Sequence, residues 1–285
     1  MHEHTSHNDQ ASALRRLAKN APRTVSGAPS YCWTVTSGKG GVGKSVFAMN
    51  FAVALSEAGR KVLLVDADEN LGKLDVMFGV SPKHRIPDIL SESVSIADAA
   101  IEVRPGLFLL AGSSGSPNYP EITMHERIAF IAAARTSFAG VTDVVFDTGA
   151  GIQERVLSYA VAADQVIVVS HYEPVAILDA YAVIKMITAK RSDASLNIVM
   201  NKSLSATECD EAAEKLRTAV KHFLSRDVRY LGIVPNDPAV SRSIVAQAPL
   251  AVASPASAAS LCIRSIAHAI SGKLIHEHQQ EAVYA

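Results

Sequence analysis

The chain has 285 residues, 48% of them hydrophobic, which is enough apolar surface for one large domain with a sizeable core. Its 27 Lys and Arg nearly balance its 28 Asp and Glu, so no global positive field indicates nucleic acid or an anionic membrane as a partner. The three cysteines lack CxxC spacing, which argues against a disulfide framework and against a zinc site. No apolar run is long enough to span a bilayer. We therefore expect a cytoplasmic protein that is at most peripheral to the inner face of the membrane or to the cell pole.

The chain begins with a polar stretch followed by a short amphipathic pattern. Asp9 can cap a helix in which Leu14 and Leu17 share one face and Arg15 lies on another. Pro and Gly then interrupt the sequence up to Ser30, which predicts a linker. We therefore expect a flexible N-terminal segment with a short helix at 1–30, a body at 31–275 and a polar tail at 276–285.

The body alternates apolar runs with helical periodicity, which predicts a parallel sheet covered on both faces. Strands are expected at 31–36, 61–66, 107–111, 142–147, 165–170, 196–201 and 229–234. Helices are expected near 44–58, 121–138, 153–162, 175–190, 206–224 and 255–274. The predicted fold is one α/β domain of three layers with a mainly parallel twisted sheet, and its ligand should lie beyond the carboxyl ends of the strands.

A glycine-rich loop at 38–45 joins the first strand to the first body helix. It matches G-x-x-x-x-G-K-[ST], in which backbone N–H groups and a helix N-terminus cradle a polyphosphate. Lys44 is expected to reach the β- and γ-phosphates, and Ser45 to ligate Mg²⁺. The residues expected to bind nucleotide here are Gly38, Lys39, Gly40, Gly41, Val42, Gly43, Lys44, Ser45 and Val46.

Carboxylates follow two of the predicted strands and should converge on this loop. Asp147 is expected to act on Mg²⁺, with a helix cap near Gln153 as the structural alternative. Asp68 is expected to orient the attacking water, and Asp66 to support the metal, although the reverse assignment stays open. These residues predict a P-loop NTPase that uses Mg²⁺.

Asn201 follows another strand and could read the edge of a base. An Asn amide both donates to and accepts from adenine, and no Asp follows to complete an N-K-x-D guanine pattern, so ATP is favoured over GTP. The alternative is that Asn201 merely starts a loop. Pro235 and Asp237, after the last strand, are expected to close the same pocket.

The extra lysine in Lys39-Gly40-Gly41-Val42-Gly43-Lys44-Ser45 makes this a deviant Walker A motif, and here the chain resembles the MinD/ParA group of P-loop ATPases. The resemblance extends through Asp66-Ala67-Asp68 and Asp147-Thr148-Gly149-Ala150-Gly151. It implies an ATP-dependent homodimer in which Lys39 reaches the partner's phosphates. With Lys39, Lys44 and Asp68 as catalytic residues, slow ATP hydrolysis would reset the dimer.

Within that group, the chain looks most like the FlhG family, also called FleN or YlxH, which regulates flagellar number and placement. Asp9, Gln10, Leu14 and Arg15 match that family's D-Q-A-x-x-L-R element. The resemblance implies that this element binds and stimulates the signal-recognition-type GTPase FlhF. It further implies flagellar switch or C-ring proteins and a flagellar transcription activator as partners, and no specific nucleic acid.

The sequence departs from the family at three places. Glu69-Asn70 stands where the family usually has Leu-Gly, and His171 stands where Thr is common. The C-terminal tail is polar and short, whereas membrane-binding members end in a basic amphipathic helix. Just before the tail lies an apolar stripe that we expect to be buried against the body rather than to face a membrane, formed by Leu261, Ile263, Ile266, Ala267, Ile270 and Leu274.

Two other functional classes are compatible with the sequence. A partitioning ATPase would need a basic surface for DNA, and Lys215, Arg217, Lys221 and Arg226 lie along one segment, although Glu211 and Glu214 dilute it. A redox protein of the same architecture would need paired cysteines for an iron–sulfur cluster, and the three cysteines are scattered.

Overall fold

The computed structural model describes residues 30–69, 72–91, 93–113, 122–136 and 138–283, with the backbone alone beyond Ser271. The helix expected from Asp9, and with it Gln10, Leu14 and Arg15, lies outside the described residues. The division of the chain into N-terminal segment, body and tail stays a prediction.

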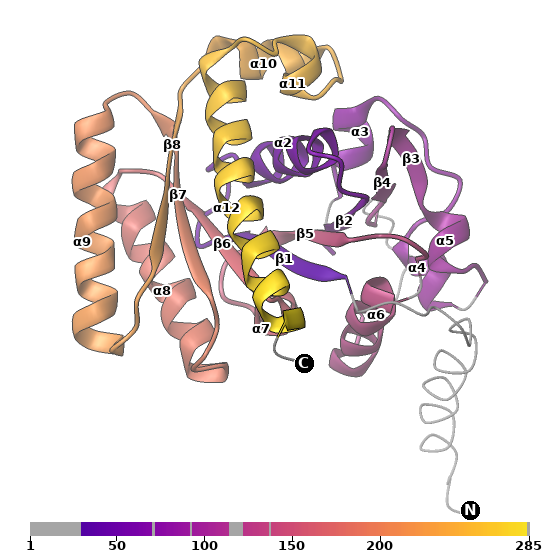
Figure 1. The fold of residues 1–285 in the computed structure, drawn as a ribbon, viewed down its shortest axis with the longest axis horizontal. Helices are drawn as coiled ribbons and strands as arrows, with labels where there is room; N and C mark the ends of the chain where they lie inside the picture. Colours follow the sequence, from indigo (N-terminus) through magenta and orange to yellow (C-terminus); the bar gives the residue numbers. More distant parts are fainter. Residues whose placement is uncertain (1–29, 70–71, 92, 114–121, 137, 284–285) are drawn as a thin grey trace, which may run out of the picture.

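An eight-stranded sheet forms the centre of the described chain (Figure 1). Its strands run in the order β3-β4-β2-β5-β1-β6-β7-β8, and every neighbouring pair is parallel except β3 with β4. The carboxyl ends of the parallel strands therefore share one edge. The strands are β1 (Tyr31–Ser37), β2 (Val62–Ala67), β3 (Ile101–Arg104), β4 (Leu107–Leu110), β5 (Asp143–Ala150), β6 (Gln165–Ser170), β7 (Leu196–Ser203) and β8 (Arg229–Pro235).

Helices connect the strands and cover the sheet. Six long ones match the sequence prediction, whereas the short helices α3, α4, α5, α10 and α11 and strand β3 were not predicted. The helices are α2 (Lys44–Glu57), α3 (Leu74–Phe78), α4 (Ile86–Leu90), α5 (Ile96–Ala99), α6 (Met124–Thr136), α7 (Glu154–Ala162), α8 (Pro174–Lys190), α9 (Ala206–Leu224), α10 (Pro238–Val245), α11 (Leu250–Ala253) and α12 (Ala258–Val283).

Alternate residues of each central strand enter two separate hydrophobic cores. Leu63 and Val144 belong to the core shared with α4 to α9. Leu64 and Val145 point to the opposite face, into the core shared with α2, α3, α10, α11 and α12. A strand buried on both faces needs apolar residues at consecutive positions, which explains the unbroken apolar runs. The predicted three-layer α/β domain is confirmed.

Helix α12 packs on α2 and β8, largely as its apolar stripe predicts (Figure 1). Ile263 and Ile270 are each 2% exposed, so these side chains belong to the core rather than to a membrane face. For Leu261, which is 51% exposed, the prediction of burial was wrong. The helix runs to Val283, past its expected end at 274. Among the described helices, none has the length and apolar character needed to cross a bilayer.

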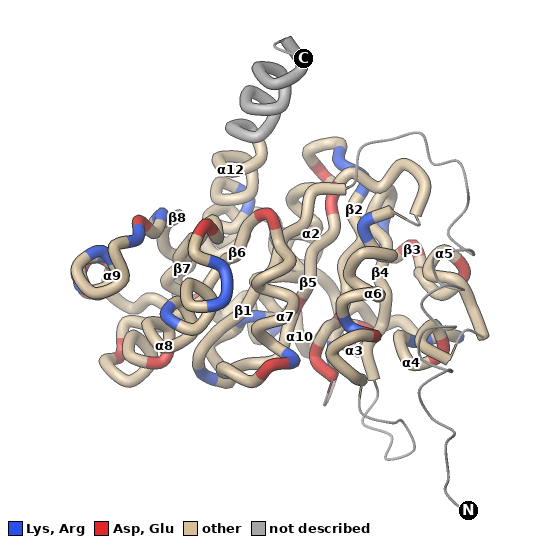
Figure 2. Tube along the Cα trace, turned by 90° about the horizontal axis from the view of Figure 1, so that it is seen from below, with Lys and Arg blue, Asp and Glu red and all other residues tan. Residues whose placement is uncertain are grey.

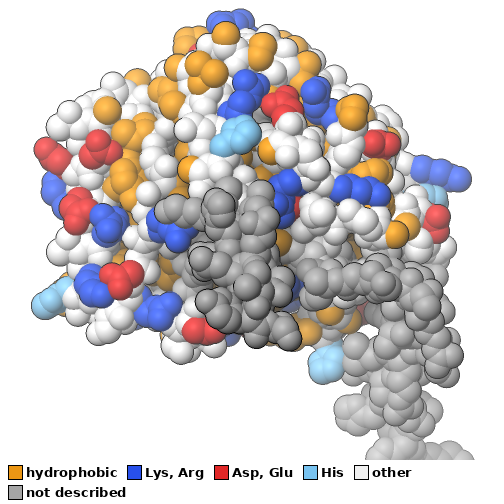
Figure 3. Space-filling model, viewed as in Figure 1, with side chains coloured by type: hydrophobic (Ala, Val, Ile, Leu, Met, Phe, Trp, Pro, Cys, Tyr) orange, Lys and Arg blue, Asp and Glu red, His pale blue; other side chains and the backbone are white. Residues whose placement is uncertain are grey.

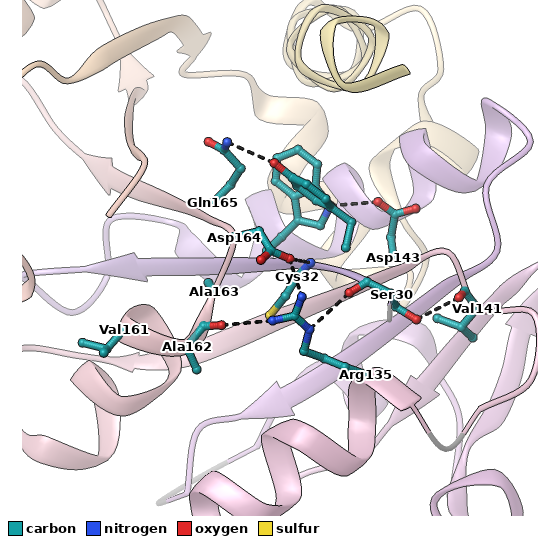
Figure 4. A network of polar contacts seen from close by, with 12 residues as sticks. Ser30, Cys32, Arg135, Val141, Asp143, Val161, Ala162, Ala163, Asp164 and Gln165 are labelled. Carbon is teal, nitrogen blue, oxygen red and sulfur yellow. Dashed lines mark hydrogen bonds and ion pairs between the residues drawn. The ribbon is translucent and has the colours of Figure 1, made fainter. Parts of the chain in front are cut away.

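A polar network fixes the start of β1 at the edge opposite the phosphate loop (Figure 4). The Arg135 guanidinium at the end of α6 donates to the Ser30 carbonyl at 3.2 Å and to Asp164 Oδ2 at 2.7 Å. The same Asp164 oxygen accepts the Cys32 amide at 2.8 Å. Three segments far apart in the sequence are thereby held together where β1 enters the sheet.

Candidate functional site

The glycine-rich loop connects the carboxyl end of β1 to the N-terminus of α2, as the sequence predicts. Gly43 is the N-cap of α2 with φ 89°, and the helix begins at Lys44. Val42 is 6% exposed and anchors the loop in the core. Because the first amides of a helix have no intrahelical acceptor, they are available to an anionic ligand at this position.

Two of the loop glycines leave no room for a side chain. A Cβ on Gly38 would lie 2.3 Å from the backbone carbonyl carbon and oxygen of Asp179, in α8. A Cβ on Gly43 would lie 2.3 Å from the Asn201 amide nitrogen, at a backbone angle that L-residues rarely adopt. Glycine is therefore required here by close packing as well as by loop curvature.

Lys44 and Asp147 meet inside the site. Lys44 Nζ lies 2.6 Å from Asp147 Oδ1, and both side chains are buried. The same nitrogen lies 3.4 Å from the Ser45 hydroxyl. Asp147 belongs to β5, whereas α7 begins at Glu154 behind the N-cap Gln153, so the alternative of Asp147 as a helix cap was wrong.

Asp66 lies beside Asp147 across the β2–β5 pair. Its Oδ2 accepts the amides of Lys73 at 2.7 Å and Leu74 at 2.9 Å, which also fixes the start of α3. Burial, together with the negative charge of Asp147, raises the pKa of the Asp66 carboxyl to about 7, although three backbone amides oppose the shift. A cation beside both carboxylates would favour their ionised forms.

This donor set fits a nucleotide-bound Mg²⁺. Among the described residues, no group of three or more His, Cys, Asp or Glu is arranged to hold a metal by itself. Mg²⁺ does not need one, since it commonly uses one or two carboxylates together with substrate phosphates and waters. Asp147, Asp66 and the Ser45 hydroxyl supply groups of that kind next to the phosphate loop.

Asp68 follows β2 and is partly exposed at the same edge of the sheet. A Cβ on Gly149 would lie 3.6 Å from Asp68 Oδ1, so this carboxylate approaches the end of β5 closely. The Asp68 amide lies 3.4 Å from Asp66 Oδ1. The structure thus brings Asp66, Asp68 and Asp147 to one place, as the strand-end argument predicts.

The two lysines of the loop lie in opposite surroundings. Lys44 is buried, whereas the Lys39 side chain is 44% exposed and its Nζ lies 3.5 Å from Glu173 Oε2. The Glu173 side chain is itself 56% exposed. An ion pair this exposed contributes only about 0–1 kcal/mol, so Lys39 can be recruited elsewhere at little cost.

Asn201 and Lys202 hold the loop from the end of β7. Asn201 Nδ2 donates to the Val42 carbonyl at 2.7 Å, and Lys202 Nζ donates to the Gly41 carbonyl at 2.7 Å. Lys202 does so from a left-handed backbone conformation with φ 56°. Sequence reasoning missed Lys202, although its place directly after Asn201 was a usable signal.

The segment after β8 is built into the fold at the same edge. Pro235 lies opposite Ser203 of β7. Asp237 caps α10 through the Ala239 amide at 2.8 Å and also accepts the Ala259 amide, at 3.2 Å, next to the start of α12. These two amides hold the pKa of Asp237 below its usual range. Both carboxylate oxygens thus join α10 to α12, a role that the sequence did not indicate.

The sequence is similar to a known protein family and to named members of it. The ParA family model, described as "NUBPL iron-transfer P-loop NTPase", matches residues 30–271. Antiactivator FleN of Pseudomonas aeruginosa is 31% identical over 83% of this chain and 84% of its own length. The flagellum site-determining protein YlxH of Helicobacter pylori is 35% identical over 74% and 71%.

A solved structure shares the fold. The septum site-determining protein MinD of Pyrococcus horikoshii, complexed with Mg-ADP, aligns with a TM-score of 0.70 at 23% identity, over 85% of this chain and 96% of that one. The phosphate loop and the strand-end carboxylates are the features expected of the family whose model matches the sequence. The chain belongs to the ParA/MinD family of P-loop ATPases.

Proposed function

We propose that this ATPase is a dimerisation switch in which ATP and Mg²⁺ join two protomers and slow hydrolysis separates them. The observation that carries the proposal is the contrast between Lys44, buried beside Asp147, and the exposed Lys39 on the same loop. Lys44 is placed to serve its own site, whereas Lys39, held among the described residues only by an exposed ion pair with Glu173, would reach the phosphates of a second protomer.

The site residues then divide the chemistry among them. Loop amides and Lys44 bind the phosphates, and Asp68 orients the attacking water. Asn201 would contact the adenine with the amide groups that its bond to the Val42 carbonyl leaves available, and Pro235 and Asp237 would close the pocket. Mg²⁺, held through Ser45, Asp147 and Asp66, would neutralise phosphate charge. The water oxygen bonds to the γ-phosphorus, the bond from that phosphorus to the β–γ bridging oxygen breaks, and ADP, phosphate and a proton leave.

We further propose that the output of the switch is flagellar. The support is the similarity to FleN and YlxH, whose names describe an antiactivator and a flagellum site-determining protein. Asp9, Gln10, Leu14 and Arg15, outside the described residues, would contact an FlhF-type GTPase. Switch or C-ring proteins and a transcription activator are the other proposed partners, in the cytoplasm or transiently at the membrane.

The dimerisation proposal is tested by the mass in solution with ADP and with a non-hydrolysable ATP analogue. We expect a monomer with ADP and a dimer with the analogue, and a monomer in both would refute the proposal. Asp68→Ala should bind ATP and remain dimeric because hydrolysis is blocked. Normal turnover in that variant would remove Asp68 from its proposed role.

The partner proposal is tested by GTP hydrolysis. A peptide covering residues 1–20 should accelerate hydrolysis by FlhF, the same peptide carrying Gln10→Ala should do so less, and the full chain lacking residues 1–20 should not do so at all. Equal GTP turnover by FlhF with and without the peptide would remove the main support for the proposed flagellar role.

A partitioning ATPase acting on DNA, or a division-site positioning ATPase, is the alternative, and α9 carries the segment that a DNA-binding role would use. Its cations are paired: Lys215 with Glu211, Arg217 with Glu214, and Lys221 with Asp227. Lys and Arg are interspersed with Asp and Glu along the trace in Figure 2 and on the face shown in Figure 3. Salt-dependent DNA retention by the ATP-bound chain lacking residues 1–20 would favour this alternative.

The three cysteines give little support to a role in holding or transferring an iron–sulfur cluster. Cys32 in β1 and Cys209 in α9 are fully buried, and Cys262 lies in α12. Burial raises the pKa of the Cys32 thiol to about 12, which disfavours the thiolate that a cluster needs. A colourless purified protein is the expected result.

A further inference from the structure

A buried ion pair joins the segment after β2 to helix α6. Arg127 Nε lies 2.5 Å from Glu69 Oε1, and Nη2 lies 2.8 Å from Glu69 Oε2, so the contact is bidentate. The side chains are 5% and 10% exposed. A bidentate guanidinium–carboxylate pair fixes the orientation as well as the distance of its two partners.

Two further contacts complete the surroundings of the pair. Arg127 Nη2 also donates to the Ile122 carbonyl at 2.8 Å. The hydroxyl of Tyr159, in α7, lies 3.4 Å from Glu69 Oε1. Burial raises the pKa of Tyr159, which therefore keeps its proton and donates to the carboxylate. Glu69 is thus held from α6 and from α7 together.

The pair lies directly beside the proposed hydrolytic residue. Glu69 follows Asp68 in the chain, and Asp66, two residues before Asp68, is held by the amides of Lys73 and Leu74. Asp68 therefore lies between two fixed points. Its own neighbourhood includes the end of β5, where Gly149 approaches its carboxylate.

We propose that Arg127 is a positioning residue for ATP hydrolysis, acting through Glu69 to hold the backbone at Asp68 in the orientation that water activation requires. The proposal rests on the proposed role of Asp68. Small misplacements of a catalytic group are costly, so the loosened pair should slow hydrolysis rather than weaken ATP binding.

Arg135 supplies a matched control because it lies on the same helix, two turns from Arg127. It pairs with Asp164 at 2.7 Å at the opposite edge of the sheet. Arg127→Met should lower kcat for ATP at least about tenfold and leave KM unchanged, whereas Arg135→Met should leave both unchanged. Both variants should lower Tm. A fall in Tm in both variants without a fall in kcat for Arg127→Met would overturn the proposal.

Variants of Glu69 test whether the two side chains act as a unit. Glu69→Ala should lower kcat as much as Arg127→Met does, and the double variant should be no slower than either single one. Glu69→Gln keeps an acceptor for the guanidinium and should retain most of the turnover. Additive losses, or a Gln variant as slow as the Ala variant, would contradict the proposed mechanism.

Hydrogen exchange separates this proposal from the proposed function. In Arg127→Met, the amides of the peptide that carries Asp68 and Glu69 should exchange faster than in the unsubstituted chain, while in Arg135→Met they should not. If the unsubstituted chain fails to hydrolyse ATP, the proposed function is wrong, and the exchange result alone decides whether Arg127 holds this segment. Unchanged exchange in Arg127→Met refutes the inference in either case.

Discussion

Gly38 and Gly40 lie in opposite surroundings although both belong to the phosphate loop. A Cβ on Gly38 would come within 2.3 Å of the Asp179 backbone, which cannot move without shifting α8. A Cβ on Gly40 would meet nothing within 4 Å. Both glycines belong to the predicted nucleotide-binding loop, but only the first is required by packing against another helix.

Gly38→Ala should therefore lower the free energy of unfolding by about 1–3 kcal/mol, because inserting a methyl group forces the loop and α8 apart. Binding of a fluorescent ATP analogue should weaken with it. Gly40→Ala is the control, and its thermal unfolding should match the unsubstituted chain. Equal stability of the two variants in thermal denaturation would contradict the packing argument.

How far the sequence predicts the site depends on whether its residues are contiguous. The loop from Gly38 to Ser45 could be predicted because motif, strand and helix follow one another, and Asp147 because it ends an apolar strand. The contacts of Lys202 with Gly41 and of Arg127 with Glu69 join residues 161 and 58 positions apart. No local pattern encodes such pairs, so they emerge only when the chain is folded.

At the level of elements, long periodic segments could be predicted and short ones could not. Helix α3 has five residues, and its start is fixed by Asp66 from another element rather than by its own sequence. Strand β3 has four residues and pairs only with β4 at the sheet edge. Such elements are too short to show periodicity and exist because tertiary contacts hold them.

Helix α12 offers a test of whether its stripe is core or membrane surface. Ile263→Ala should lower the free energy of unfolding by about 2–4 kcal/mol, because the side chain is 2% exposed and its removal leaves a cavity. Leu261→Ala, at a position 51% exposed on the same helix, should have a small effect. Urea denaturation measures both, and equal effects would show that the stripe does not pack on α2 and β8.

At the scale of the whole molecule, β1 runs from the edge of the sheet where the described chain begins to the edge where the phosphate loop lies. Its start is held by Arg135 and Asp164 (Figure 4), and its other end leads into the phosphate loop. Seven residues of strand span about 23 Å. The described chain therefore begins, at Ser30, far from the phosphate loop, and we expect deletion of residues 1–20 to change neither ATP turnover nor Tm. A slower ATPase after this deletion would show that the segment serves the nucleotide site directly.

We expect Lys39 to be needed for dimerisation but not for ATP binding to the monomer. Because its side chain is exposed and paired only with exposed Glu173, Lys39→Ala should leave ATP binding to the monomer within about twofold of normal. The substitution should nevertheless abolish dimerisation with a non-hydrolysable ATP analogue, because the ammonium group that would contact the phosphates of the second protomer is gone. Lys44→Ala, by contrast, should lose ATP binding itself, because Lys44 lies inside the site beside Asp147.

Glu173→Ala should have the opposite effect on dimerisation to Lys39→Ala and serves as its control. Removing this carboxylate frees Lys39 from its exposed ion pair, so the dimer should form at the same or a lower protein concentration than in the unsubstituted chain. Sedimentation with the analogue compares the three variants at matched concentrations. Normal dimerisation of Lys39→Ala would mean that the exposed lysine is a surface charge and that two protomers, if they associate, do so without exchanging a catalytic residue.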